Sequence, residues 1–91
     1  MAKPMEDQIT GLETELGYLI QFPDNAITEK ITGTLYFENK QNKDLNYEQP
    51  LVLSGSNVLI PKERLENGPW LMTMNWAYDG KPYTTTRIIN Y

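Results

Sequence analysis

The sequence predicts a single small all-β domain, and three observations support this prediction. The chain has 91 residues, a length that suits one domain. From residue 16 onward, apolar side chains alternate with polar ones in several runs, which is the period of a strand with one buried face. Turn-forming residues, such as Pro23-Asp24-Asn25 and Asp79-Gly80, separate these runs. We therefore expect residues 16–91 to form one antiparallel β-sandwich of six to seven strands.

Residues 1–15 lack this alternation. Apolar side chains recur there with helical spacing: Met5, Ile9, Leu12 and Leu16. Gly11 weakens such a helix, and chain termini are usually poorly ordered unless they dock. We therefore expect a leader or stalk remnant over residues 1–15 that is either helical or disordered.

The first two strands are predicted over residues 16–22 and 30–38. In the first strand the apolar face comprises Leu16, Tyr18, Ile20 and Phe22. In the second strand the inward set is Ile31, Gly33, Leu35 and Phe37. The outward set of that strand is Thr32, Thr34, Tyr36 and Glu38. Such strands have one buried face and one solvent face.

The middle of the chain contains turns and a strand with a proline. Residues 39–44 are wholly polar and predict a hairpin loop. A strand over residues 45–53 contains Pro50, which has no N–H donor and therefore favours a sheet edge or a bulge. A short strand and one helical turn at residues 62–65 follow, and we expect Leu65 to close the end of the core.

The last third carries the clearest signal, a hairpin centred on Asp79-Gly80. This dipeptide lies between two strand-like runs and favours a type I′ turn, in which both central residues need positive φ. The register that follows pairs Tyr78 with Lys81 and Trp76 with Tyr83. We expect the two aromatic rings of the second pair to stack across the strands.

The strand before this turn has four large side chains on one face: Trp70, Met72, Met74 and Trp76. Thioether sulfur is a soft ligand, so two methionines raise the question of a copper(I) site. However, the chain has no histidine and no cysteine, and methionine commonly fills gaps in a core. We interpret this face as core and expect no metal or cofactor site.

The composition also disfavours catalysis. Without histidine or cysteine the chain lacks the commonest general base and the thiolate nucleophile. Glu63 with Glu66, or Asp24 with Glu29, could form a glycosidase pair, but solvated loop charges explain them better. The formal net charge of −4 disfavours nucleic acid as a partner. We therefore expect a protein that is not an enzyme.

One set of outward residues is a candidate partner face. Opposite the tryptophan face, the strand presents Leu71, Thr73, Asn75 and Ala77. This set carries no charge, and the centres of interfaces are depleted in charged residues. An equally good explanation is that Ile9 and Leu12 cover the set, or that it lies inside the sandwich.

Surface tyrosines offer a second binding hypothesis, a small-ligand or carbohydrate-binding module. The candidate stacking residues are Tyr36, Tyr47, Tyr78 and Tyr91. Ordinary cross-strand pairing on a sheet surface explains such residues more simply. A cluster of coplanar exposed rings would favour the binding module, and dispersed rings would count against it.

The ordered part of the chain resembles the extracytoplasmic domain of the FixH family, especially its Bacteroidetes-type members. The resemblance covers roughly residues 16–91 and rests on the run from Lys30 to Phe37, Leu45, the run from Asn57 to Pro61, and a landmark pattern. That pattern is Gly68-x-Trp70-x5-Trp76-x2-Asp79-Gly80-x2-Tyr83. One position departs from the family, because Pro69 stands where members often carry Arg or Lys.

The resemblance implies an immunoglobulin-like sandwich on the periplasmic side of the inner membrane, held by an N-terminal membrane helix. It implies a role in assembly of cbb3-type cytochrome c oxidase, alongside a copper-transporting P-type ATPase, through protein–protein interaction. It supplies no catalytic or ligand residues. The chain contains no apolar run of membrane-spanning length, and we expect the natural protein to begin further upstream.

Overall fold

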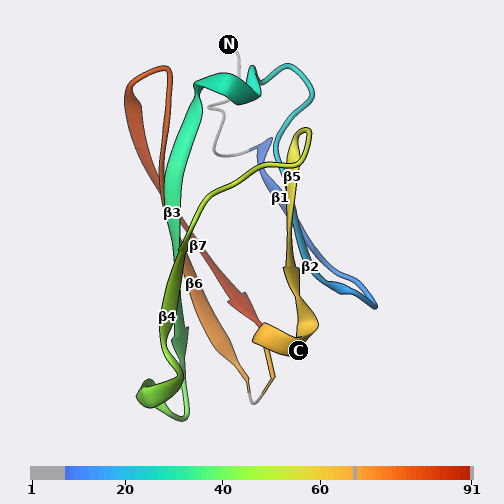
Figure 1. Ribbon diagram of the computed structural model, residues 1–91, viewed down its shortest axis with the longest axis vertical. Coiled ribbons are helices and arrows are strands. Elements are labelled where there is room, and N and C mark those ends of the chain that lie inside the picture. Colours follow the sequence, from blue (N-terminus) through green and yellow to red (C-terminus); the bar gives the residue numbers. More distant parts are fainter. Residues whose placement is uncertain (1–7, 67, 91) are drawn as a thin grey trace.

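The computed structural model describes residues 8–66 and 68–90, which form a two-layer β-sandwich (Figure 1). Within them the strands are β1 (Thr10–Glu13), β2 (Gly17–Gln21), β3 (Ile31–Asn39), β4 (Tyr47–Pro50), β5 (Asn57–Pro61), β6 (Trp70–Tyr78) and β7 (Lys81–Ile89). Short 3-10 turns connect some of them: η2 (Thr28–Lys30), η3 (Lys43–Leu45) and η4 (Lys62–Arg64). The all-β fold class predicted from the sequence is confirmed.

The strands divide into two antiparallel sheets. Sheet A has the order β1-β2-β5, and sheet B has the order β4-β3-β6-β7. The chain crosses from sheet A to sheet B after β2, returns after β4, and crosses again after β5 (Figure 1). This arrangement of three strands against four is immunoglobulin-like. No helix in the described part of the chain has the length and apolar content needed to cross a membrane.

The core lies between the sheets and is built mainly from alternate residues of β2, β3, β5, β6 and β7. Sheet A and the residue after β2 contribute Tyr18, Ile20, Phe22, Val58 and Ile60. Sheet B contributes Ile31, Leu35, Phe37, Trp70, Met72, Met74, Trp76 and Ile89. The period of two seen in the sequence therefore predicted the buried face of β3 and β6 correctly.

The β6–β7 hairpin has the predicted register. Tyr78 lies opposite Lys81 and Trp76 opposite Tyr83. Asp79 and Gly80 have φ of 52° and 85°, the positive values that the type I′ turn requires. Both strands have nine residues, and β6 also pairs along its whole length with β3.

The strand that contains Pro50 lies at an edge of sheet B, as predicted. It is shorter than expected, because β4 ends at Pro50 and the chain then leaves sheet B for β5. The N–H of Leu51 still donates to the carbonyl of Gly33 at 2.9 Å. After β5, the turn η4 places Leu65 in the core, fully buried, which confirms its predicted position.

The N-terminal prediction needs correction. Residues 10–13, expected to be helical or disordered, form the strand β1 and pair with β2. A side chain at Gly11 would overlap the Tyr18 ring, so glycine lets β1 lie against that ring. Leu16 is 70% exposed in the turn between these strands rather than in the core. Met5 lies outside the described residues.

Candidate functional site

The predicted partner face is the outer surface of sheet B. On β6 the core residues alternate with the predicted set, which points away from sheet A: Leu71, Thr73, Asn75 and Ala77. Thr73 lies between Tyr36 of β3 and Thr86 of β7, and Asn75 lies between Thr34 and Thr84. Threonines of β3 and β7 therefore surround the predicted residues together with Tyr36, whereas β4 adds Glu48 beside Tyr36 and Pro50 beside Thr34.

The centre of this surface carries no charge. Its carboxylates, Glu38 and Glu48, lie at one side, on β3 and β4. The Thr84 hydroxyl donates to the Asn75 amide oxygen at 3.1 Å, so neighbouring polar groups of this face already satisfy each other in part.

The structure resolves how this face relates to the rest of the chain. Ile9 is buried in the core and Leu12 lies on β1 in sheet A, so neither covers the β6 residues. The face does not lie inside the sandwich either, because the opposite side of β6 packs against sheet A. Among the described residues, this leaves the outer surface of sheet B open.

The two methionines of β6 belong to the core. Met72 is 1% exposed and Met74 is fully buried, and both lie between the two tryptophans on the inner face. Within residues 8–66 and 68–90, no three carboxylates lie close enough together to hold a metal ion.

The tyrosines do not form one platform. Tyr36 lies on the outer face of sheet B, whereas Tyr47 stacks on Phe37 with ring centroids 4.7 Å apart. Tyr78 lies near the opposite end of β6 from Trp70, and its hydroxyl accepts a hydrogen bond from the N–H of Ile27 at 3.0 Å. Tyr91 lies outside the described residues. The three described rings are therefore dispersed over different surfaces.

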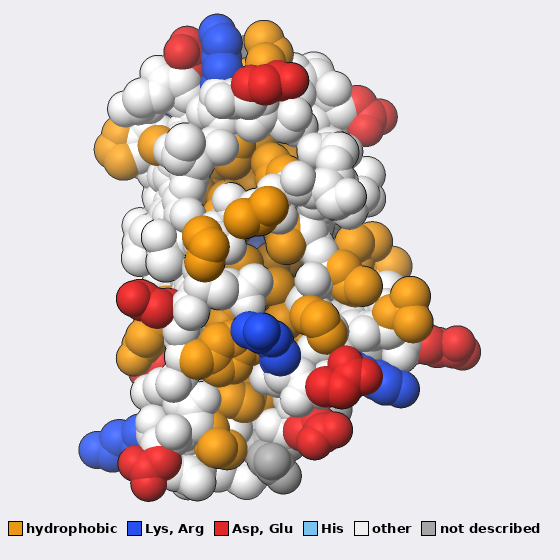
Figure 2. Space-filling view, viewed as in Figure 1, with side chains coloured by type: hydrophobic (Ala, Val, Ile, Leu, Met, Phe, Trp, Pro, Cys, Tyr) orange, Lys and Arg blue, Asp and Glu red, His pale blue; other side chains and the backbone are white. Residues whose placement is uncertain are grey.

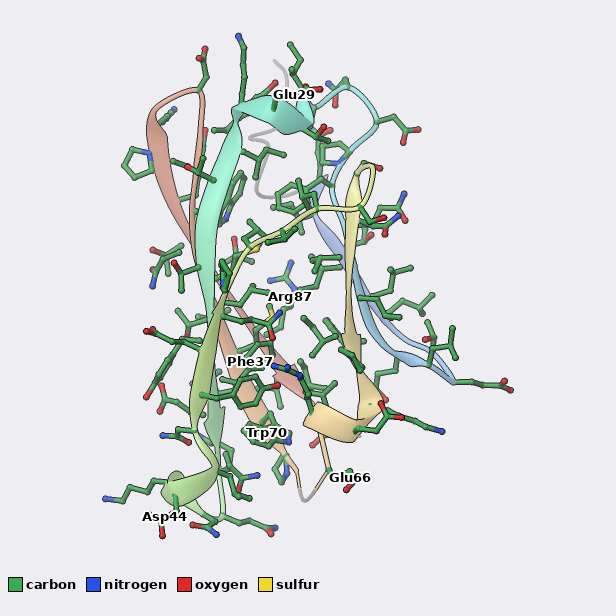
Figure 3. All side chains as sticks on the ribbon, viewed as in Figure 1. Glu29, Phe37, Asp44, Glu66, Trp70 and Arg87 are labelled. Atoms are coloured by element: carbon green, nitrogen blue, oxygen red, sulfur yellow. The ribbon has the colours of Figure 1, made fainter. Side chains whose placement is uncertain are left out.

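The two carboxylate pairs considered for a glycosidase site, Asp24 with Glu29 and Glu63 with Glu66, lie at opposite ends of the molecule from each other. All four side chains are exposed. Glu29 is at one end and Glu66 at the other (Figure 3). Glu63 and Glu66 line an open hollow of about 340 Å³ together with Arg64, Tyr47 and Trp70.

Tyr47 forms the wall of this hollow and is held in place from several sides. Its hydroxyl donates to the carbonyl of Arg64 at 3.0 Å, and the Arg64 guanidinium lies 5.9 Å from its ring centroid. Burial raises the pKa of Tyr47 to about 12, although the nearby Arg64 charge opposes this shift. The Arg64 guanidinium also donates to the Gln49 side chain at 3.3 Å, which links η4 to β4.

Sequence reasoning missed a second open surface, on the outer face of sheet A. The β-ladder places Leu12 of β1 opposite Leu19 of β2, and Leu19 opposite Leu59 of β5. Leu12 is 61% exposed, Leu59 is 38% exposed and Leu19 is half-buried. Figure 2 shows hydrophobic side chains gathered over the β1–β2 hairpin. We call Leu12, Leu19 and Leu59 the leucine row.

The sequence held one signal for this row. Leu19 interrupts the polar side of the alternation in residues 16–22, which is unusual for a solvent face. The signal was incomplete, because recognising the row also required the pairing of β2 with both β1 and β5.

No protein-family model, no curated protein and no solved structure matches this chain.

Proposed function

We propose that this chain is a non-catalytic accessory domain that docks onto a partner protein through the outer face of sheet B. The observation that carries this proposal is an open face, four strands wide, whose centre around Thr73 and Asn75 has no charged side chain. Interface centres are depleted in charge in the same way. Glu38 and Glu48 would lie at the rim, where carboxylates stay hydrated and set orientation rather than affinity.

The size of the face suits a modest, reversible contact. Three of its strands have nine residues each, which corresponds to about 30 Å of length and, with β4, about 19 Å of width. Because β4 has only four residues, the flat area is about 490 Å², well below the roughly 800 Å² per partner of a standard stable interface. An interface of this size falls in the class of weak and transient contacts.

We further propose that the partner belongs to a membrane complex, namely the assembly machinery of a cbb3-type cytochrome c oxidase with its copper-transporting P-type ATPase. The domain would work on the periplasmic side of the inner membrane, anchored by a segment upstream of this chain. This finer proposal is supported by the resemblance of the pattern from Gly68 to Tyr83 to the FixH family. The hairpin register that the pattern predicts agrees with the pairing of β6 and β7.

The docking face is tested by placing charge at its centre. In the double variant Thr73→Lys/Asn75→Lys, both side chains point away from the core, so the thermal unfolding midpoint should change little. Capture of the oxidase subunits and of the ATPase from detergent-solubilised membranes should fall about tenfold or more, because two lysines would have to be desolvated.

The matched control places two lysines at exposed loop positions, Asn25→Lys/Ser54→Lys. This variant should capture both partners as the wild-type chain does. Equal capture by all three proteins would contradict docking through sheet B. Unfolding of the Thr73→Lys/Asn75→Lys variant alone would show that the face is internal.

A further inference from the structure

The outer edge of β7 is the longest unpaired strand edge in the described part of the chain. Sheet A ends at β1 and β5, which have four and five residues, and sheet B ends at β4, which has four, and at β7, which has nine. Short length, proline and bulges are the usual devices that protect a strand edge from pairing. Both β4 and β5 end in proline, whereas the pairing of β7 with β6 runs without a bulge from Lys81 to Ile89. The edge of β7 therefore has the least protection of the four.

The hairpin register fixes which backbone groups of β7 point outward. Tyr78 and Lys81 flank the two-residue turn and form the first hydrogen-bonded pair, and the two kinds of antiparallel pair alternate from there. The residues whose N–H and C=O groups point away from β6 are therefore Pro82, Thr84, Thr86 and Ile88. Proline has no N–H, which suits a position where β6 needs no donor. The edge presents three N–H donors and four carbonyls from this set.

These backbone groups are open to a partner. Within residues 8–66 and 68–90, one of them has a hydrogen bond: the carbonyl of Thr86 accepts from the Nη1 atom of Arg87 at 2.9 Å. A carbonyl oxygen has two lone pairs, so this bond leaves room for a second donor. The side chains of all four outward residues are exposed, and that of Ile88 is 55% exposed. Donors and acceptors that alternate along an extended edge are matched by another β-strand.

The β7 strand of a second copy provides such a match. Two copies can pair antiparallel about a two-fold axis, which makes the contact self-complementary. With Thr84 of one copy opposite Thr86 of the other, Pro82 lies opposite Ile88, and each of the three outward N–H groups of one copy meets a carbonyl of the other. Threonine opposite threonine is also a favourable cross-strand pair. The missing N–H of Pro82 therefore leaves no donor of either edge unpaired.

Charge distinguishes this register from its neighbours. The strand β7 carries Lys81 and Arg87 and no carboxylate. In the register described, each Arg87 lies opposite Tyr83 of the other copy, and the two arginines are four positions apart, about 14 Å along the strands. Sliding one strand by two residues places Arg87 opposite Lys81 in one direction and brings the two arginines diagonally together in the other. Like charges in such positions are destabilising, so the threonine-paired register is favoured.

From this geometry we infer that the outer edge of β7 is a homodimer interface, in which two copies pair antiparallel around Thr85. The two B sheets then form one continuous sheet. A second copy is the occupant that the sequence itself specifies, since every copy carries the same open edge and the edge matches itself in both hydrogen bonds and charge spacing. The inference uses a strand edge, so it does not depend on the proposed docking through the outer face of sheet B.

Sedimentation equilibrium of the full chain measures the dimer. The wild-type chain should show a monomer–dimer equilibrium with a dissociation constant between about 10 μM and about 1 mM, the strength of a small contact. Higher ionic strength should tighten the dimer, because two chains of net charge −4 repel each other. The variant Thr86→Pro removes an outward N–H without removing a hydrogen bond to β6. Its circular dichroism spectrum should match that of the wild type, whereas the dimer should weaken about tenfold or more.

Two charge variants at exposed positions test the register. Thr84→Lys/Thr86→Lys puts lysine opposite lysine in the proposed pairs, and Thr84→Glu/Thr86→Glu puts glutamate opposite glutamate. Each variant alone should stay monomeric at concentrations at which the wild-type chain dimerises. An equimolar mixture should form heterodimers, because lysine then faces glutamate in both pairs. The matched control, Asn25→Lys/Ser54→Lys in exposed loops, carries the same added charge and should dimerise as the wild type does.

Several results would overturn the inference. A wild-type chain that stays monomeric throughout this concentration range would do so, as would a folded Thr86→Pro variant that dimerises as tightly as the wild type. A mixture of the lysine and glutamate variants that remains monomeric would exclude the proposed register. Dimerisation that Leu12→Ser/Leu59→Ser abolishes would place the contact on the leucine row instead. If Thr86→Pro fails to fold, the mixture of charge variants decides the question.

Discussion

Trp76 and Tyr83 stack across the β6–β7 hairpin, with ring centroids 4.7 Å apart and an angle of 23° between the ring planes. The Trp76 ring also meets Phe22 edge to face at 5.3 Å, and Phe22 follows β2 of the other sheet. The indole N–H of Trp76 donates to the buried hydroxyl of Thr85 at 3.0 Å. One side chain thus ties the hairpin to the core and to sheet A.

Thr85→Val should destabilise the domain although it keeps the side-chain shape. The substitution leaves the indole N–H of Trp76 buried without its acceptor, at a cost of about 1–3 kcal/mol. Thr86→Val, on the exposed face of the same strand, should change the free energy of unfolding by less than about 0.5 kcal/mol. Urea denaturation measures the free energy of unfolding of both variants. Equal losses in Thr85→Val and Thr86→Val would show that the hydrogen bond between Trp76 and Thr85 does not stabilise the fold.

Met74→Ala should cost about 2–5 kcal/mol, because the fully buried side chain would leave a cavity between the sheets. The neighbouring Asn75→Ala, which changes an exposed side chain, serves as the control in the same denaturation series. A shift for Met74→Ala well below this range would mean that the core closes around the missing atoms.

No tight copper site is expected in the isolated domain. Both thioethers of β6 point into the core, and the chain offers no histidine or cysteine to assist them. Calorimetric titration with Cu(I) under reducing conditions should show no tight one-to-one binding. Submicromolar binding that disappears in Met72→Leu/Met74→Leu would refute this expectation.

Alkaline pH should weaken the fold through Tyr47. The pKa of this residue is raised from 10.0 to about 12 by burial, so the folded state holds the phenol proton more tightly than the unfolded state does. The resulting stabilisation is fully present below pH 10 and is lost as pH rises from about 10 to about 12.

The measurement is a series of urea midpoints across this pH range for the wild-type chain and Tyr47→Phe. The loss should be smaller in the variant, which has no phenol to ionise at this position. Some loss should persist, because burial also raises the pKa of Tyr18. Identical profiles for the two proteins would exclude Tyr47 as a source of the alkaline transition.

Local patterns predicted the strands that have one regular wet face. In β3, strict alternation from Ile31 to Glu38 fixed which side chains are buried, because the side-chain period of a strand is two. Around Asp79-Gly80, the turn chemistry also fixed the register, since a two-residue loop leaves one pairing of the flanking strands.

The N-terminal strand could not be predicted in the same way. In residues 9–16 the apolar side chains happen to follow helical spacing, yet Ile9 is buried in the core while Leu12 faces outward. Gly11, which argues against a helix and a strand alike, is present because the Tyr18 ring needs the space. That reason exists only in the folded structure.

The candidate surfaces were predictable to different degrees. The outward set around Thr73 followed from alternation, but its openness depended on where Ile9 and Leu12 lie. The leucine row joins residues 12, 19 and 59 through the β2–β5 pairing between distant segments, which no local pattern specifies.

Docking through the outer face of sheet B is tested most directly by photo-crosslinking from the centre of that face. The proposed docking predicts that a photoreactive phenylalanine analogue at position 73, in the chain mixed with detergent-solubilised membranes, forms adducts with a subunit of the oxidase assembly complex or with the copper-transporting ATPase. The same analogue at the exposed loop position 25 should form none. Absence of these adducts at position 73, or equal adducts at both positions, would contradict docking through sheet B.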